Sequence, residues 1–366
     1  MMRADQVLKL GILGGGQLGR MLGMAGLPLA VEPVIWDPEP SACARLVGQQ
    51  ICESYTDAAA LNRFVSDLAV CTFEFENIPS AILRELSHRV PVYPPLAALE
   101  ASQDRLAEKQ MFAALGINTA PYVAVDSLED LNAAVAHLGL PAILKTRRLG
   151  YDGKGQYVLR EVSDIQRAWD ALGTVPLILE GFVSFCRELS VIAVRGQCGE
   201  MAFYAVSENV HRNGILLTSH AKRHDPLQAQ AEKHAETLLE HLQYVGVLCL
   251  ELFEVDGVLL ANEFAPRVHN SGHWTIEGAE TSQFENHVRA VLGLPLGSTA
   301  CLGSSALVNL VGNLPTLANL LSLKHVYPHY YGKMPKPGRK VGHVTVRAEH
   351  EHERDALVSR ILQELT

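Results

Sequence analysis

Two apolar segments around the dipeptide Asp256-Gly257 place the strongest constraint on how this chain folds. Residues 245–253 and 258–264 are both rich in apolar and β-branched side chains. An Asp-Gly pair between two such segments is typical of a tight turn, because both residues tolerate the left-handed backbone that the turn needs. The sequence therefore predicts a β-hairpin over these residues.

The length of the loop decides which side chains share a face of this hairpin. A two-residue loop would set Glu251 opposite Asn262 and turn Glu263 to the other face of the sheet. A three-residue loop over 255–257, with a bulge at Gly257, would make Glu251 and Glu263 diagonal neighbours on one face, about 7–8 Å apart. We favour the second register because it brings the two carboxylates together.

Two neighbouring carboxylates without a counter-charge repel each other, so a hard cation bound between them is the natural compensation. Magnesium is the leading candidate because it commonly binds a few carboxylates together with substrate phosphates. The alternative is that both glutamates are solvated positions on an edge hairpin. Apolar residues on both faces of the hairpin weaken that alternative, since a buried carboxylate needs a partner.

The composition is that of a globular protein whose partner is a small molecule. The chain has 366 residues, 48% of them hydrophobic, and a mean hydropathy of +0.09, which allows a large core and two or three domains. A net charge of −9 argues against nucleic acid as a partner. No apolar run reaches the roughly 20 residues of a membrane span and no signal peptide is recognisable, so we expect a cytoplasmic protein without membrane contact. The seven cysteines are scattered without metal-binding spacing, and we expect reduced core residues.

The pattern of apolar residues changes along the chain. Residues 8 to about 100 alternate strand and helix patterns, which indicates a parallel α/β unit. A proline-rich boundary follows, then a predicted helix over 102–115 and a small α+β unit over 120–185. Residues 187–291 contain further strands, helices and the hairpin. Residues 295–303 have the composition of a linker to a C-terminal piece of about 65 residues.

A glycine-rich turn follows the first predicted strand. Gly14 to Gly19 match the pattern GxGxxG, and Asp37 ends the next strand at a spacing close to that of a ribose-binding acid. Glycines at such a turn let the backbone approach an anion at the start of a helix. A dinucleotide, another anion such as a substrate phosphate, and a turn that only packs a helix on a sheet are all compatible with this pattern.

A cationic loop follows a second strand. Lys145 ends an apolar strand, and Arg147, Arg148 and the glycine-rich loop over 150–155 come next. Glycines and cations between two strands make an electropositive lid that suits triphosphate oxygens. A solvated surface hairpin is the alternative, but a lysine that ends an apolar strand is an unusual place for a merely solvated charge. Backbone groups next to Glu180 could contact the adenine edge of a nucleotide, and Glu188 could hold its ribose hydroxyls.

A third polar cluster follows the hairpin. Arg267, His269 and Asn270 lie a few residues beyond Glu263. An arginine so close to a metal site can hold a small carboxylate or carbonate against a phosphoryl group during transfer. Taken singly, each histidine is more simply explained as a satisfied core residue. The density of polar groups between apolar segments is what favours a functional site.

These clusters, in this order, resemble an ATP-grasp ligase. The chain is similar in particular to the family of N5-carboxyaminoimidazole ribonucleotide synthases of purine biosynthesis, and the resemblance covers nearly all residues. It rests on the stretches GILGGGQLGRML (11–22), EFENIP (74–79), GYDGKGQ (150–156), NEFAPRVHNSGHWT (262–275) and PGRKVGH (337–343). The resemblance implies an α/β and α+β protein with an ATP-grasp fold. Its expected parts are an N-terminal Rossmann-like domain over 1–100, an ATP-grasp domain over 101–298 with a lid at about 120–185, and a C-terminal domain over 299–366.

The resemblance also implies roles for individual residues. Magnesium would bind Glu251 and Glu263. ATP would contact Arg105, Lys145, Gly150, Tyr151, Asp152, Gly153, Lys154, Gly155, Gln156, Glu180, Gly181, Phe182, Val183, Glu188, His211, Asn262 and Glu263. The ribonucleotide would contact Gln17, Leu18, Glu76, Tyr151, Asp152, Asn270, Lys333, Arg339 and Lys340. The residues expected to take part in the chemistry are Arg267, which would hold bicarbonate, and Lys145, Asp152 and His269.

The implied reaction converts ATP, bicarbonate and 5-aminoimidazole ribonucleotide into the N5-carbamate, ADP and phosphate through carboxyphosphate. A homodimer is expected from the same resemblance. Ala265 stands where many ATP-grasp relatives have an asparagine that binds metal, which leaves the ligands of a second magnesium ion open. The alternatives are a formate-dependent phosphoribosylglycinamide transformylase-like ligase, a Rossmann oxidoreductase that binds NAD, and a nucleotide sensor without catalytic activity.

Overall fold

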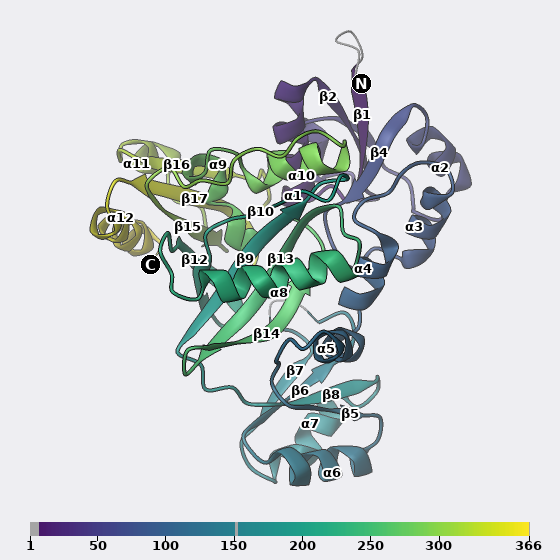
Figure 1. Ribbon diagram of the computed structural model, residues 1–366, viewed down its shortest axis with the longest axis vertical. Helices are drawn as coiled ribbons and strands as arrows, with labels where there is room; N and C mark the ends of the chain where they lie inside the picture. The colour runs from purple at the N-terminus through teal and green to yellow at the C-terminus, as the bar shows by residue number, and fades with distance from the viewer. Residues whose placement is uncertain (1–6, 151–152, 366) are drawn as a thin grey trace.

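The computed structural model describes residues 7–150 and 153–365. Three β-sheets with helices against them make up this part of the chain (Figure 1). A parallel sheet near the N-terminus and a small antiparallel sheet lie toward opposite ends of the longest axis, and a large sheet lies between them. Among the described residues, no helix has the length and apolarity that a membrane crossing needs.

The N-terminal sheet is parallel, with the strand order β3-β2-β1-β4. Its strands are short apolar runs because both faces of the sheet are buried. Leu10 and Ile12 of β1 pack into one core, whereas Leu13 packs into another on the opposite face. The elements of this region are β1 (Leu8–Leu13), α1 (Gln17–Gly26), β2 (Val31–Trp36), β3 (Gln49–Ile51), α2 (Ala58–Phe64), β4 (Leu68–Phe73) and α3 (Ser80–Ser87).

Two helices lead from this sheet into the small antiparallel sheet, whose order is β5-β8-β6-β7. The predicted helix over 102–115 begins at Arg105, because the carboxylate of Asp104 accepts the backbone N–H groups of Leu106 and Ala107 and so caps it. Apolar side chains from the sheet and its two helices form a separate core, which confirms the predicted α+β unit. The elements are α4 (Leu96–Ser102), α5 (Arg105–Ala114), β5 (Tyr122–Val125), α6 (Leu128–Leu138), β6 (Ala142–Thr146), β7 (Gln156–Leu159), α7 (Asp164–Leu172) and β8 (Leu177–Gly181).

The large sheet has the order β14-β13-β9-β11-β12-β15-β17-β16, with β10 paired to β9. Helix α8 packs on β9 and β13 (Figure 1). The elements are β9 (Arg187–Arg195), β10 (Met201–Phe203), β11 (Ser207–Arg212), β12 (Ile215–Ala221), α8 (Gln228–His241), β13 (Gly246–Val255), β14 (Val258–Ala265), α9 (Thr275–Gly278), α10 (Gln283–Val291), β15 (Ser304–Val311), α11 (Leu317–Leu321), β16 (Val326–Tyr330), β17 (Lys340–Ala348) and α12 (Glu351–Glu364).

The C-terminal piece continues the central sheet. Strand β15 pairs with β12, with Ser219 opposite Leu307, so the three strands after the linker extend the sheet that carries the hairpin. Their outer face is covered by α12, which packs on β15 and β17. The C-terminal strands are therefore tied to the hairpin through one continuous sheet, and the domain boundaries given above stay a prediction.

The hairpin forms, but its register differs from the one we favoured. Val255 pairs with Val258, so the loop has two residues, and Asp256 and Gly257 have φ values of 50° and 77°. The irregularity lies at Asn262 instead of Gly257: Leu252 pairs with Ala261, and Glu251 then pairs with Glu263. One extra residue on β14 thus restores the common face that a two-residue loop alone would have removed. The two carboxylates are directly opposite each other, not diagonal.

Candidate active site

A cavity of about 1040 Å³ lies where the three sheets meet. It collects side chains from the glycine turn, from β6 and its loop, from the hairpin, and from the loop before β17. Residues separated by more than 300 positions in sequence therefore face one space. The candidate residues that line it are Gln17, Leu18, Glu76, Arg105, Lys145, Gly150, Gly153, Lys154, Gln156, Glu188, His211, Glu251, Asn262, Glu263, Arg267, His269, Asn270, Lys333, Arg339 and Lys340.

Not every candidate is found among the described residues that line this cavity. Tyr151 and Asp152 lie outside the described residues, so their predicted contacts with ATP and substrate stay predictions. Glu180 is buried beneath the cavity wall on β8, where it accepts a hydrogen bond from Lys145. The other candidates that are absent from the lining are Gly155, Gly181, Phe182 and Val183.

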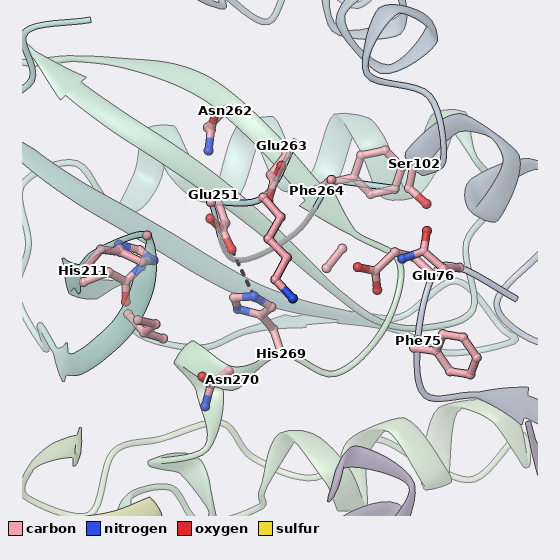
Figure 2. A pocket seen from close by; sticks show the side chains of 18 of the residues that line it. Phe75, Glu76, Ser102, His211, Glu251, Asn262, Glu263, Phe264, His269 and Asn270 are labelled. Carbon is pink, nitrogen blue, oxygen red and sulfur yellow. Dashed lines mark ion pairs between the residues drawn. The ribbon is translucent and has the colours of Figure 1, made fainter. Parts of the chain in front are cut away.

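Each of the paired glutamates has its own cation. The ring Nε2 of His269 lies 3.0 Å from a Glu251 carboxylate oxygen, and Arg105 Nη1 donates to Glu263 over 2.6 Å. In Figure 2, Glu251 and His269 point toward each other, with Glu263 on the neighbouring strand. Burial raises the pKa of Glu251, but His269 outweighs burial and holds that pKa at about 2. Repulsion between the two carboxylates is thus relieved by one protein cation beside each of them, neither of which lies on the hairpin itself.

Helix α5 holds the bulge that aligns these glutamates. Lys109 is 2% exposed, and its ammonium donates to the carbonyl of Asn262 over 2.8 Å and to that of Ala261 over 3.4 Å. Glu108, also 2% exposed, accepts the backbone N–H of Phe264 over 2.7 Å. These contacts replace hydrogen bonds that a bulge removes from the ladder. The sequence analysis did not predict a role for either residue. The pattern that could have indicated one is two adjacent charged residues on a helix that otherwise buries apolar side chains.

The hairpin residues fit a magnesium ion. Glu251 and Glu263 offer carboxylate oxygens at directly opposite positions, and Asn262 adds an amide oxygen beside them on the cavity wall. Oxygen donors of this kind, few in number and open to a substrate, are what magnesium prefers. Ala265 also lines the cavity but brings no donor, so a second ion would take its ligands from the substrate, water or the same two glutamates.

Lys145 is fixed by a buried carboxylate. Its ammonium donates to Glu180 over 2.9 Å, and Lys109 lies 3.7 Å from the same oxygen. Burial raises the pKa of Glu180, but the two lysines lower it to about 2. The carboxylate therefore stays charged and holds Lys145 at the cavity wall, where an ammonium can meet a phosphate.

Arg267 is oriented by Glu76. Its Nε donates to the Glu76 carboxylate over 2.5 Å, and its Nη1 donates to the carbonyl of Val268 over 3.1 Å. Burial lowers the pKa of the guanidinium, but Glu76 more than offsets this and raises it. A guanidinium fixed in this way faces the cavity as a permanent cation that can hold a small planar anion.

The segment after the hairpin is held by a glutamine that the sequence reasoning missed. The Gln283 side chain accepts from the backbone N–H of His269 over 2.9 Å and donates to its carbonyl over 2.6 Å. Asn270 forms a reciprocal amide pair with Asn309, at 3.0 and 2.8 Å. Gln283 begins α10 and Asn309 lies on β15, so the position of His269 depends on elements that follow it in the chain.

The glycine turn is filled by the protein's own carboxylates. Gly15 donates its N–H to Asp37 over 2.5 Å, and Gly16 and Gly19 donate theirs to Glu74, the latter over 2.7 Å. A Cβ at Gly16 would lie 2.4 Å from a Glu74 oxygen, so the glycine is needed for this close approach. Helix α1 has no side-chain cap of its own, and Glu74 supplies one. A pyrophosphate at these amides would meet two carboxylates, and the dinucleotide interpretation is therefore not supported.

The basic C-terminal residues come close to the glycine turn. The ammonium of Lys333 donates to the side-chain oxygen of Gln17, which places the loop before β17 against the start of α1. Arg339 donates to the carbonyl of Met334 over 3.3 Å and lines the same cavity as Lys340. On another wall, His211 is paired with Glu188. Burial lowers the pKa of His211, but Glu188 outweighs burial and raises it.

Comparison with known proteins agrees with this arrangement. Three family models match the chain in order: a ribonucleotide synthetase preATP-grasp domain over residues 7–103, an ATP-grasp domain over 110–284, and a phosphoribosylaminoimidazole carboxylase C-terminal domain over 305–356. The N5-carboxyaminoimidazole ribonucleotide synthase of Pseudomonas aeruginosa is 52% identical over 356 residues, covering 97% of this chain and 98% of the relative.

Solved structures give the same result. The N5-carboxyaminoimidazole ribonucleotide synthetase of Thermus thermophilus superposes with a TM-score of 0.94 at 52% identity, covering 98% of each chain. A synthase from Aspergillus clavatus in complex with ADP and 5-aminoimidazole ribonucleotide has a TM-score of 0.90 at 29% identity, again over 98% of each chain. The predicted ATP-grasp fold with its additional N-terminal and C-terminal parts is confirmed. The chain belongs to the family of N5-carboxyaminoimidazole ribonucleotide synthases, the ATP-dependent ligases of purine biosynthesis.

Proposed function

We propose that the cavity carboxylates 5-aminoimidazole ribonucleotide with bicarbonate at the expense of ATP, through carboxyphosphate, giving the N5-carbamate, ADP and phosphate. The observation that carries this proposal is the convergence of three kinds of group on one space. Paired carboxylates, a fixed lysine and a fixed guanidinium lie between a cationic lid on one side and a basic C-terminal loop on the other. ATP, bicarbonate and the phosphorylated ribonucleotide are all anionic, so each needs a cationic side chain or a bound metal ion as its partner.

Phosphoryl transfer would occur over the hairpin. Glu251 and Glu263 would hold a magnesium ion, which neutralises charge on the transferring phosphoryl group when bound. Arg105, which is paired with Glu263, and Lys145, which is held by Glu180, would bind the phosphate oxygens of ATP. The protein's contribution at this step is to position charges before the reaction, which needs no reorganisation at the moment of transfer.

Bicarbonate would be held by Arg267. Its guanidinium is oriented by Glu76 and would keep one bicarbonate oxygen in line with the γ-phosphorus atom. His269, whose ring is paired with Glu251, would add positive charge beside the same anion. Attack by this oxygen forms the bond of carboxyphosphate and releases ADP.

Carboxyphosphate reacts with water, so the cavity must close before the amine arrives. Gly150, Gly153 and Lys154, which lie on the loop beside β6, line the cavity and would cover it. The substrate phosphate would bind Lys333, Arg339 and Lys340 on the opposite side. The exocyclic amine then attacks the activated carbon, phosphate leaves, and the amine loses a proton.

The competing functions lack a supporting observation. A Rossmann oxidoreductase would need the amides of Gly15, Gly16 and Gly19, which donate to internal carboxylates instead. A nucleotide sensor would have no use for the bicarbonate guanidinium or the basic loop. A formate-dependent ligase differs only in the anion, and substitution of formate for bicarbonate tests it.

The test is phosphate release from ATP by the purified chain in magnesium. When bicarbonate and 5-aminoimidazole ribonucleotide are both present, we expect the amount of phosphate released to match the amount of carbamate formed. When either substrate is omitted, we expect no carbamate. Formate in place of bicarbonate should give no product from the ribonucleotide. Product formation with formate, or NADH binding without ATP turnover, would contradict the proposal.

Three wider proposals rest on the family relationship. We infer a division into domains over 1–100, 101–298 and 299–366, a homodimer, and a cytoplasmic location. The three family models, which match separate parts of the chain, support the division. Light scattering on the purified protein tests the homodimer, and a mass of one chain would contradict it.

A further inference from the structure

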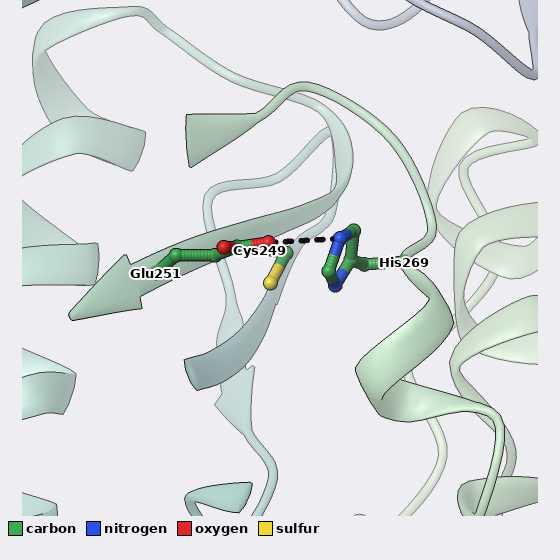
Figure 3. A group of neighbouring side chains, drawn as sticks. All are labelled: Cys249, Glu251 and His269. Carbon is green, nitrogen blue, oxygen red and sulfur yellow. Dashed lines mark ion pairs between the residues drawn. The ribbon is translucent and has the colours of Figure 1, made fainter. Parts of the chain in front are cut away.

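Three potential metal ligands of different chemistry meet at the edge of the cavity. Donor atoms of Cys249, Glu251 and His269 all lie within 4.8 Å of one another (Figure 3). Cys249 and Glu251 are two residues apart on β13 and so point to the same face, and His269 approaches from the segment after β14. Cys249 is fully buried and has no part in the reaction proposed above.

We propose that Cys249, Glu251 and His269 form a binding site for a thiophilic divalent cation of the Zn²⁺ class, and that this cation competes with magnesium for Glu251. The donor set is one thiolate, one imidazole and one carboxylate. Zinc accepts all three, at about 2.3 Å for sulfur and about 2.0–2.2 Å for nitrogen and oxygen, whereas magnesium prefers oxygen. Three protein ligands with one position open to a cavity is also the arrangement of reactive zinc sites.

The surroundings hold His269 in the orientation that a metal needs. Its Nδ1 accepts the backbone N–H of Ser271 over 3.3 Å and lies 2.9 Å from the hydroxyl of the same residue, which accepts from Ser190 over 2.8 Å. Nε2 is therefore the nitrogen that points to Glu251. A hydrogen bond at the second nitrogen commonly orients the ring of a histidine that binds metal. Gln283 fixes the backbone of His269 on both sides. The ligands are therefore held in place before an ion arrives.

One protein cation lies close to two of the three donor groups. The guanidinium of Arg267 interacts with both Cys249 and Glu251. The same cation would repel a metal ion, but Arg267 is paired with Glu76 over 2.5 Å, which offsets that repulsion. Zinc binding would break the contact of 3.0 Å between His269 and Glu251 and release the thiol proton together with any proton on Nε2.

Occupation of this site would switch the ligase off. Glu251 cannot serve both ions, and zinc binds nitrogen and sulfur ligands far more tightly than magnesium does. The inhibitory part of this inference rests on the proposed role of Glu251 in holding magnesium. The binding part does not, because it depends only on the three donor atoms.

The experiment uses Co²⁺ as a spectroscopic stand-in for zinc. The full chain, freed of metal with a chelator, is titrated with cobalt chloride while the thiolate-to-cobalt charge-transfer absorption is followed. Cys71→Ala is the matched control, because Cys71 is also a fully buried strand cysteine but lies on β4. We expect the band in the wild type and in Cys71→Ala, its displacement by Zn²⁺, and its loss in Cys249→Ala.

Cys249→Ser, which keeps nearly the same volume, serves as a second variant in case the alanine variant does not fold. Inhibition by Zn²⁺ is measured at fixed magnesium, with each variant compared with its own rate without zinc. The zinc concentration for half-inhibition should rise by at least about tenfold when Cys249 is replaced. A charge-transfer band that survives in both Cys249 variants, or no band in the wild type, would overturn the site. A band without any carboxylation activity would instead contradict the proposed function and leave the metal site standing.

Discussion

Replacement of Lys109 by methionine tests whether the bulge at Asn262 sets the metal site. The ammonium of Lys109 is buried and donates to the Asn262 carbonyl over 2.8 Å, with a weaker contact of 3.4 Å to Ala261. Methionine keeps the length and apolar stem of the side chain but removes the donor. Glu180 keeps its second partner, because Lys145 still donates to it over 2.9 Å. The hydrogen bonds that this substitution removes are therefore mainly those at the bulge.

The size of the effect follows from the contact that is lost. A hydrogen bond from a charged donor contributes about 1.5–3 kcal/mol, and the contact of 3.4 Å adds little. If this free energy keeps Glu263 opposite Glu251, its loss lowers the fraction of molecules with an aligned site. The free Mg²⁺ concentration at half-maximal rate should then rise roughly 10- to 150-fold, because each 1.4 kcal/mol is about a factor of ten.

The assay is phosphate release as a function of free Mg²⁺, with hydrogen exchange at the amides of Glu263 and Phe264 as a second readout. Faster exchange at those amides, with an unchanged Michaelis constant for the ribonucleotide, would place the defect at the bulge. Lys233→Met is the control, because Lys233 is an exposed lysine on α8 that pairs only at the surface with Glu236. Equal magnesium dependence in Lys109→Met and Lys233→Met would refute the reasoning.

Three further changes should have distinct effects. Glu263→Gln keeps the side-chain shape but removes a metal carboxylate, so ATP turnover should fall by at least about two orders of magnitude while circular dichroism is unchanged; wild-type turnover would contradict the metal assignment. Arg339→Ala should raise the Michaelis constant for the ribonucleotide by about one or two orders of magnitude with little effect on ATP, and the reverse would mean that the basic loop faces the nucleotide. Burial lowers the pKa of His287 to about 3, and its Nδ1 accepts the N–H of Val247, so folding favours the neutral ring. The stability that this neutral ring contributes is complete above about pH 6.5 and is lost as the pH falls toward 3, at up to about 1.4 kcal/mol per pH unit. The free energy of unfolding of His287→Gln should therefore depend less on pH in this range than that of the wild type. Equal pH dependence of the two unfolding free energies would disprove this role of His287.

Much of the fold follows from local patterns in the sequence. The alternation over residues 8–100 predicts the parallel sheet, and Asp256-Gly257 between two apolar segments predicts the hairpin, although we favoured a three-residue loop and the loop has two residues. Local patterns could not locate the bulge at Asn262. It depends on Lys109 and Glu108, about 150 residues earlier in the chain, and no pattern within the hairpin reports them.

In the candidate site, too, local motifs predict some features, whereas others depend on contacts between residues far apart in the sequence. Most of the residues grouped by motif line one cavity, because the motifs lie at the ends of strands and helices where these elements meet the cavity. The glycine turn was ambiguous because the pattern GxGxxG does not say what accepts its amides. The answer lies in Asp37 and Glu74, which reach the turn only after the parallel sheet has formed. Long-range side-chain contacts of this kind need the folded chain.

Transfer of a bicarbonate oxygen to phosphate tests the central claim most directly. If bicarbonate attacks the γ-phosphorus atom while it is held by Arg267, one of its oxygens remains on the phosphate when the amine takes the carbon. The reaction is run with freshly added ¹⁸O-labelled bicarbonate in unlabelled water, and the phosphate is analysed by mass spectrometry before the label exchanges with solvent. We predict one ¹⁸O atom in the phosphate for each carbamate formed. Phosphate without ¹⁸O, whose fourth oxygen would have come from water, would contradict the account, because ATP would then be hydrolysed without forming carboxyphosphate.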